Sequence, residues 1–261
     1  KQCARAIAAA GATVLGAARS EEKAERTIAD LAGDFVPVVC ELSDPESVLG
    51  AVKTATDYGE PLDAIICNAG IMALPELELH HGYEKQFFVN HVGHFILVTK
   101  LGDQLAEDGR VVMVSSEAHK NAPKEGVQLD NLDGSMGYSP WKAYGQSKFA
   151  NLLFAKELAR RFDDSGQVAN AVHPGVIDTN LTRHMNVFAR VAWSCLGPLF
   201  LKSEPQGAAT QTWAAVHPDA AEINGEYFVD CNIGEPRARA EDPELARRLW
   251  ERTEEIVAEV T

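Results

Sequence analysis

The sequence predicts an α/β protein built on a doubly wound parallel β-sheet. Three observations support this fold class. Short apolar segments alternate with segments of helical spacing, most positions of the apolar segments are apolar, and two helical segments open with an aspartate followed by proline. Strands that are apolar throughout belong to sheets covered on both faces. Because crossover connections between parallel strands are right-handed, helices are expected on both sides of the sheet.

Five segments rich in β-branched residues are predicted as buried strands. In chain order they are Thr13–Ala17, Phe35–Val39, Ala64–Cys67, Val111–Val114 and Val168–Val172.

Helical segments lie between and after these strands. Asp44-Pro45-Glu46 and Asp242-Pro243-Glu244 each supply a capping carboxylate and a proline at the first helical position, which is a helix start signal. The helices predicted from spacing are Ser20–Leu31, Phe87–Leu101 and Tyr144–Phe162. The loosest stretch, Glu117–Lys142, is rich in Gly, Pro, Asn and Asp, and a loop of this length is often functional.

Length and composition limit the classes of function. The 261 residues contain no linker, repeat or low-complexity stretch, so we expect one domain over residues 1–261. A formal net charge of −14 repels phosphate backbones, so no nucleic-acid partner is expected. No apolar run is long enough for a transmembrane segment. The five scattered cysteines favour a reducing compartment, and we expect a cytoplasmic protein.

Small and hydroxyl side chains follow three of the predicted strands. Asn68-Ala69-Gly70, Ser115-Ser116 and His173-Pro174-Gly175 stand at these strand ends. In an open parallel sheet, ligands bind beyond the carboxyl ends of the strands. The sequence therefore predicts a ligand site at this edge.

Tyr144 and Lys148 lie four residues apart on a predicted helix and so share one face. A phenol beside an ammonium is an acid/base pair in a partly desolvated cleft, where positive charge favours the phenolate. The alternative is a solvent-facing Tyr and Lys on an ordinary helix surface.

Several motifs in the same chain resemble the short-chain dehydrogenase/reductase family. They are Cys67-Asn68-Ala69-Gly70, Asn90, Ser116, Tyr144-Gly145-Gln146-Ser147-Lys148 and Pro174-Gly175, in family order over nearly the whole chain. Three features resemble the branch of the retinol dehydrogenases and the WW-domain oxidoreductase in particular. They are Asn90-His91-Val92-Gly93-His94-Phe95, the 28-residue separation of Ser116 from Tyr144, and Gly225-Glu226-Tyr227-Phe228. The resemblance implies a Rossmann-like fold.

The resemblance also implies a role for each matching residue. Tyr144 would be the general acid or base on the substrate oxygen, and Lys148 would lower its pKa and hold the nicotinamide ribose. Ser116, rather than Ser115, would hydrogen-bond the substrate oxygen, and Asn90 would hold a water that connects Lys148 to solvent. The residues implied along the cofactor are Asn68, Ala69, Gly70, Pro174, Gly175, Ile177 and Thr179.

The choice between NADP(H) and NAD(H) is expected to depend on the end of the strand Thr13–Ala17. Ala18-Arg19-Ser20 follows it, with no carboxylate to bind a ribose 2′-hydroxyl and with a guanidinium able to pair with a 2′-phosphate. NADP(H) is therefore favoured, although Arg19 could also be a solvated loop charge. Glu41-Leu42 stands where the family has Asp-Leu beside the adenine.

One family feature is missing from the sequence. The first strand of the sheet and the Gly-rich turn that follows it are absent before Lys1-Gln2-Cys3-Ala4. We therefore expect the chain to be part of a longer protein, and as it stands to bind cofactor weakly and to have poor stability. The missing strand would leave two inner sheet edges unpaired.

The expected substrate is a lipophilic alcohol, aldehyde or ketone, for example retinoid-, steroid- or ketone-like. This follows from the apolar segment Leu181–Leu201, which the resemblance makes a substrate lid. A core helix, or a face touching a membrane or another subunit, is the alternative for that segment. The histidine pairs His80-His81 and His91/His94 have no third ligand nearby, so no metal is expected.

Two further expectations concern the whole protein. Relatives often form homodimers through two long helices, which here would be Phe87–Leu101 and Tyr144–Phe162. The alternative to an enzyme is a catalytically silent scaffold that keeps the fold for protein interaction.

Overall fold

A computed structural model of the chain describes residues 1–175 and 202–261. Five strands form one sheet in the order β3 (Leu62–Cys67), β6 (Leu105–Val114), β7 (Val168–His173), β8 (Tyr227–Val229) and β9 (Asn232–Ile233). The first four of these strands are parallel, and β9 is antiparallel to β8. Strands β1 (Val14–Ala18) and β2 (Phe35–Val39) form a separate parallel pair. A small antiparallel hairpin joins β4 (Leu79–His80) to β5 (Tyr83–Glu84).

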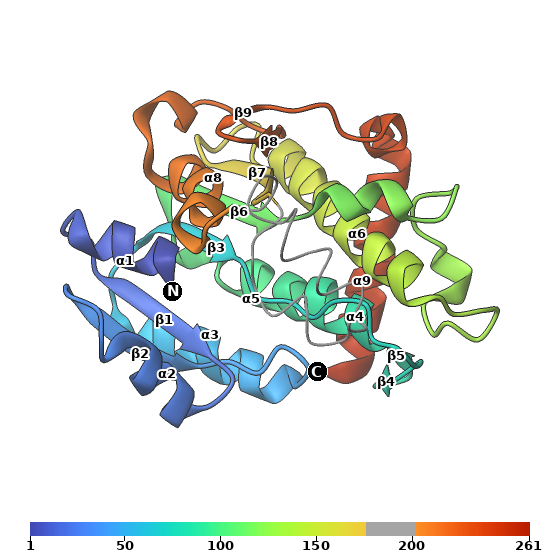
Figure 1. Ribbon diagram of the computed structural model, residues 1–261, viewed down its shortest axis with the longest axis horizontal. Coiled ribbons are helices and arrows are strands. Elements are labelled where there is room, and N and C mark those ends of the chain that lie inside the picture. Colours follow the sequence, from blue (N-terminus) through green and yellow to red (C-terminus); the bar gives the residue numbers. More distant parts are fainter. Residues whose placement is uncertain (176–201) are drawn as a thin grey trace, which may run out of the picture.

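Strand β6 shows how the sheet is buried on both faces. Val111 and Met113 face the larger core, which contains the aromatic and leucine side chains of the long helix α6 (Pro140–Arg161). Val112 and Val114 face a second core, which they share with Ala214 and Ala215 of α8 (Glu204–Val216). Alternate residues of one strand thus point into different apolar layers, which explains why the strand is apolar throughout. The predicted Rossmann-like α/β fold is confirmed (Figure 1).

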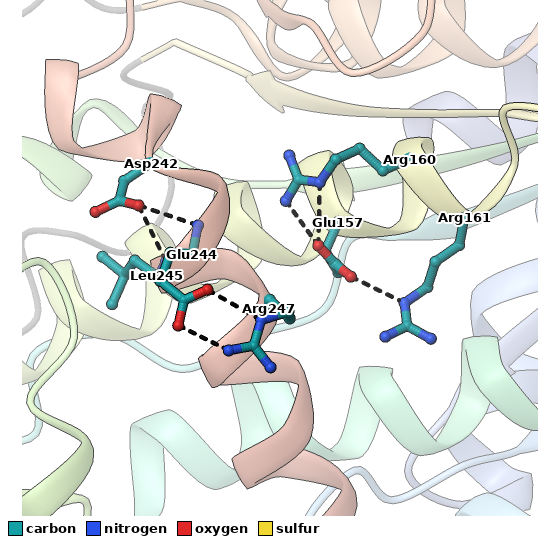
Figure 2. A network of polar contacts seen from close by, with 7 residues as sticks. All are labelled: Glu157, Arg160, Arg161, Asp242, Glu244, Leu245 and Arg247. Atoms are coloured by element: carbon teal, nitrogen blue, oxygen red, sulfur yellow. Dashed lines mark hydrogen bonds and ion pairs between the residues drawn. The ribbon is translucent and has the colours of Figure 1, made fainter.

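The remaining helices are α1 (Gln2–Ala9), α2 (Glu21–Ile28), α3 (Pro45–Tyr58), α4 (Lys85–Phe87), α5 (Gly93–Lys100) and α9 (Pro243–Val260). A capping Ser or Asp begins α2, α3 and α9, whereas α1 and α5 have no side-chain cap. Asp44 accepts a hydrogen bond from the Glu46 backbone N–H, and Ser20 accepts one from that of Lys23. Asp242 accepts bonds from the first turn of α9 (Figure 2). These side chains satisfy backbone donors that have no partner within the helix.

The segment predicted as one helix over Phe87–Leu101 is interrupted. A π-helix, η1 (Phe88–Val92), separates α4 from α5 and contains Asn90. Gly93 lies directly on residue 42, because a Cβ there would be 2.4 Å from the Leu42 carbonyl oxygen. The widened turn therefore stands where another segment presses against the helix.

Within the described residues, no strand joins the β1–β2 pair to the five-stranded sheet. Strand β1 pairs with β2 alone and β3 pairs with β6 alone, while α1 packs against α8 (Figure 1).

Helix α9 covers the long helix α6 (Figure 1). Its apolar face consists of Leu245, Ala246, Leu249, Trp250 and Ile256, all buried. Every residue of α6 from Gly145 to Ala155 is buried within the chain.

None of the helices in residues 1–175 and 202–261 combines the length and apolarity that crossing a bilayer requires.

Candidate active site

Three strand ends meet at one edge of the five-stranded sheet. Residues 68–70 follow β3, residues 115–116 follow β6, and residues 173–175 follow β7. Since β3, β6 and β7 are parallel neighbours, their carboxyl ends open to the same side. The Ser115 N–H donates to the Val172 carbonyl over 2.8 Å, which extends the β6–β7 ladder to the start of the site.

The two adjacent serines have different surroundings. Ser115 is fully buried, and its hydroxyl donates to the Lys148 carbonyl over 2.7 Å, so it has a structural partner inside the protein. Ser116 is only partly buried, and its hydroxyl oxygen accepts a 3.2 Å bond from the Ala118 N–H. Ser116 is therefore the serine with access to a ligand.

Tyr144 is half-buried on α6, beside Ser116. Two effects act on the pKa of its phenol: burial raises it, and hydrogen bonding from the Ser116 side chain lowers it. Burial prevails, so the pKa of Tyr144 is raised. The expectation that Lys148 lowers this pKa is not met here, because Lys148 interacts elsewhere.

Lys148 lies one helical turn after Tyr144 and is only 4% exposed. Its Nζ donates to the Val114 carbonyl over 2.9 Å and lies 5.9 Å from the centre of the Tyr144 ring. Burial lowers the pKa of Lys148 to about 8. The ammonium is thus held against the end of β6, behind the phenol ring.

Asn90, on the π-helix, is fully buried and fastens the loop after Gly70. Its Oδ1 accepts the Ile71 N–H over 2.8 Å, and its Nδ2 donates to the Ile71 carbonyl and to Ser147 Oγ, each over 2.9 Å. All its amide atoms are therefore engaged with the protein. Its main-chain carbonyl is bonded to the Nδ1 of His94 over 2.9 Å.

The edge beside Asn68, Ala69 and Gly70 fits a ligand that lies along the backbone. All three residues are exposed, and a Cβ on Gly70 would lie 2.9 Å from Asn90 Oδ1 and 3.5 Å from Lys148 Nζ. A side chain at position 70 would fill the space in front of both groups. Nearby, the Gln211 amide donates to Asn68 Oδ1 over 3.4 Å, while its buried Oε1 has no hydrogen-bond partner among the described residues.

The residues predicted to contact the adenosine half of a cofactor lie after β1 and β2. Arg19 is exposed and makes no side-chain hydrogen bond or ion pair with the described residues. Glu41 accepts bonds from the N–H and hydroxyl of Ser43, and Leu42 is buried against Gly93. The guanidinium is therefore available to an anion, whereas Leu42 mainly packs.

The nicotinamide end of the predicted site is described only in part. Pro174 and Gly175 are partly buried, and Gly175 has a φ of +87° with the Lys202 side chain against its Cα. Ile177, Thr179 and the proposed lid Leu181–Leu201 lie outside the described residues.

Sequence patterns did not single out three residues around Ser116 and Tyr144. His119 and Arg237 hydrogen-bond the loop that begins at Ser116, and the Trp141 ring lies edge-on to that of Tyr144, 6.2 Å between centroids. His173, which was named at its strand end, accepts the Glu117 N–H with its Nδ1. In the sequence, only the position of His119, three residues after Ser116, could have indicated that it lies near this serine.

Within residues 1–175 and 202–261, no group of three or more His, Cys, Asp or Glu residues is arranged for a metal. The buried His91 and His94 instead hydrogen-bond Thr253 Oγ1 and the Asn90 carbonyl.

Comparison with known proteins identifies the family. The family model described as short chain dehydrogenase matches residues 1–188, and the chain belongs to this family. It is 39% identical to the short-chain dehydrogenase TIC 32 A, chloroplastic, of Brassica napus, over 81% of this chain and 68% of that protein. It is 35% identical to human retinol dehydrogenase 13, over 98% of this chain and 80% of that protein. A crystal structure of an uncharacterised protein from Mycobacterium paratuberculosis superposes with a TM-score of 0.78 at 33% identity, covering 98% of this chain and 88% of that one.

Membership of this family makes the protein an oxidoreductase with a nicotinamide cofactor and a small-molecule substrate. The resemblance to the retinol dehydrogenase branch is confirmed, since relatives of that name match most of the chain.

Proposed function

We propose that the protein transfers a hydride between NADP(H) and a carbonyl or alcohol group of a lipophilic substrate. The observation that carries the proposal is the grouping of Ser116, Tyr144 and Lys148: a hydroxyl and a phenol adjoin at the open end of the sheet, with a buried ammonium behind the phenol ring.

The protein's own residues would supply orientation and the proton. The hydroxyls of Ser116 and Tyr144 would both donate to the substrate oxygen, where negative charge develops during reduction. Because its pKa is raised, Tyr144 is protonated at neutral pH and can deliver its proton to that oxygen. Lys148, whose Nζ is held at the end of β6 behind the phenol ring, would hold the nicotinamide ribose. Asn90 would hold a water that connects Lys148 to solvent, while its side-chain amide keeps the loop at Ile71 in place.

When bound, the cofactor supplies the hydride. The residues proposed to hold it are Asn68, Ala69, Gly70, Tyr144, Lys148, Pro174, Gly175, Ile177 and Thr179, with Glu41 and Leu42 near the adenine. We propose a preference for NADP(H) because the exposed Arg19 guanidinium follows β1 without a carboxylate beside it, which suits a 2′-phosphate.

A lipophilic substrate is supported by apolar side chains near Tyr144. Trp141 is 52% exposed and packs edge-on against the Tyr144 ring. The exposed Leu77 lies against Gly134, and the Tyr138 hydroxyl donates to the Leu74 carbonyl, so the loops carrying these residues adjoin. We propose a retinoid-, steroid- or ketone-like molecule as the substrate.

We also propose a cytoplasmic location for the protein. The cysteine pattern supports it, and the four described cysteines are free thiols. The middle of α6 is buried within the chain, where α9 packs against it. We therefore propose that two copies of the protein would form a homodimer through other surfaces.

The test is turnover of NADPH and NADH with aldehydes of increasing chain length, for the wild type and Tyr144→Phe. We expect faster turnover with NADPH, a rate that rises with chain length, and a loss on the order of 10²–10⁴ in Tyr144→Phe. Equal rates for the two proteins would instead favour the catalytically silent scaffold.

A further inference from the structure

The loop that carries Ser116 is held by a histidine three residues further on. Ser116 caps the 3-10 helix η3 (Glu117–Asn121). Its carbonyl oxygen accepts the backbone N–H of His119 over 3.0 Å and also lies 2.7 Å from the Nδ1 of the same ring. His119 is fully buried, so both bonds are shielded from water.

The hydrogen bonds of His119 define one tautomer of its ring. A carbonyl oxygen can only accept, so Nδ1 carries the proton. The other nitrogen, Nε2, accepts the backbone N–H of Arg237 over 3.1 Å and is therefore unprotonated. Burial lowers the pKa of His119, in agreement with a neutral ring. The His119 ring thus links Ser116 to Arg237, which lies 118 positions after the histidine in the sequence.

Arg237 holds the far end of the same loop. Its guanidinium donates to the carbonyls of Ala122, Pro123 and Lys124 over 3.0, 2.8 and 2.8 Å. It also lies over the Phe149 ring of α6, 5.9 Å from the ring centre. Residues 116–124 are therefore fixed at both ends by one partner segment.

The loop lies directly on the helix that carries Tyr144. A Cβ on Gly145 would be 2.6 Å from the Ala118 carbonyl oxygen and 2.8 Å from the Ala122 nitrogen. The glycine after Tyr144 thus lets η3 approach the α6 backbone. The separation of Ser116 from Tyr144 depends on this contact being maintained.

We propose that His119 is a positioning residue, which holds the Ser116 carbonyl through its Nδ1–H. Arg237 anchors the His119 ring and the end of the loop. Together they keep the Ser116 hydroxyl at the correct distance from Tyr144. This inference rests on the proposed function. His119 itself contacts no reacting atom. Its effect on rate arises because small misplacements of a reacting group are costly, on the order of 10² in rate for about 1 Å.

Two substitutions separate the hydrogen bond from the packing. His119→Phe keeps the ring volume against Tyr227 and Phe149 but removes both polar contacts. His119→Asn leaves a cavity but places an amide N–H where Nδ1 stands. We expect kcat to fall on the order of 10² in His119→Phe and to recover to within about tenfold of wild type in His119→Asn, with KM nearly unchanged in both. A packing role alone would give the opposite order.

A second readout does not depend on turnover. Hydrogen exchange of the backbone amides of residues 117–122 should accelerate in His119→Phe and in Arg237→Met, and remain near wild type in the control variants. Lys120→Ala and Arg239→Ala are those controls. The exposed Lys120 lies in the loop and pairs with Glu117, the exposed Arg239 donates to the Glu125 carbonyl, and neither side chain contacts Ser116.

The outcomes distinguish this inference from the proposed function. A wild type that reduces no carbonyl compound, with faster exchange in His119→Phe, would contradict the function and leave the positioning role intact. An active His119→Phe with kcat within twofold of wild type, or unchanged exchange in that variant, would overturn the inference.

Discussion

At the residue scale, the site contains a buried positive charge that opposes stability. Lys148 is nearly inaccessible to water, and the described residues around it include no carboxylate that bonds it. Its pKa is lowered from the ordinary value of 10.5 to about 8. A shift of this size corresponds to on the order of 3 kcal/mol by which folding is opposed while the side chain is charged.

Replacing this lysine should stabilise the fold while abolishing activity. In Lys148→Met the Val114 carbonyl keeps a donor, because Asn151 Nδ2 lies 3.2 Å from it. We expect the free energy of unfolding at pH 7 to rise by about 1–3 kcal/mol, measured by urea denaturation. Between pH 8 and 10.5 the unfolded wild type binds a proton that the folded form has lost, so wild-type stability rises with pH and the difference shrinks. A variant less stable than wild type at both pH 7 and pH 10 would contradict this; Lys142→Met, at an exposed position, is the control.

At the element scale, polar contacts fix where helices begin and end. Figure 2 shows Asp242 bonded to the first turn of α9 and Glu157 bonded to Arg160 and Arg161 near the end of α6. Asp242 accepts the N–H groups of Glu244 and Leu245 over 3.0 and 3.2 Å.

Loss of this cap should weaken α9. We expect Asp242→Ala to lower the free energy of unfolding by about 1 kcal/mol, whereas Asp242→Asn should cost only a few tenths, because asparagine caps a helix about as well. Thermal unfolding monitored by circular dichroism measures both. If the two variants lose equal stability, the ion pair with Arg239 rather than the cap would be responsible.

Elements with strong local signals were predictable, and those set by tertiary contacts were not. The capped helices and the apolar strands lie within a few residues of their predicted positions, although β3 and β6 begin earlier and α6 begins at Pro140. Strand β8 has only three residues, and α8 is rich in Ala, Gly and Thr, so neither has a clear period. The π-helix around Asn90 ends beside the contact of Gly93 with Leu42, and local sequence reveals neither feature.

The same distinction applies to the site. Spacing predicted the pair of Tyr144 and Lys148, strand ends predicted the position of Ser116, and the family resemblance joined the three; their catalytic roles stay predictions. The prediction that the pKa of Tyr144 is lowered was wrong, because burial raises this pKa more than the hydrogen bond with Ser116 lowers it. The bonds of His119 and Gln211 join residues that are more than 100 positions apart, so no short pattern could indicate them.

At the scale of the whole molecule, α9 completes the larger core. The Trp250 ring stacks on Phe154 at 5.4 Å and meets Phe95 edge-on at 4.8 Å, while the Arg161 guanidinium lies over it at 3.9 Å. The C-terminal helix therefore shares aromatic packing with both α5 and α6. A single domain over residues 1–261 stays a prediction that this packing supports.

Truncating that aromatic side chain should affect the entire fold. We expect Trp250→Ala to lower the free energy of unfolding by about 3–5 kcal/mol in one cooperative urea transition. Trp141→Ala, at an exposed position, should cost less than about 1 kcal/mol. A separate early transition in Trp250→Ala would show instead that α9 unfolds on its own.

We propose that Ser116, Tyr144 and Lys148 together reduce a carbonyl with a hydride from the nicotinamide. This reaction is tested most directly by incubating the protein with a long-chain aldehyde and NADPH that carries deuterium at the transferable position, and by analysing the alcohol by mass spectrometry. We predict one deuterium on the carbinol carbon with wild type and almost none with Tyr144→Phe over the same time. Labelled alcohol formed equally by both proteins, or no labelled alcohol with any carbonyl compound, would contradict the account.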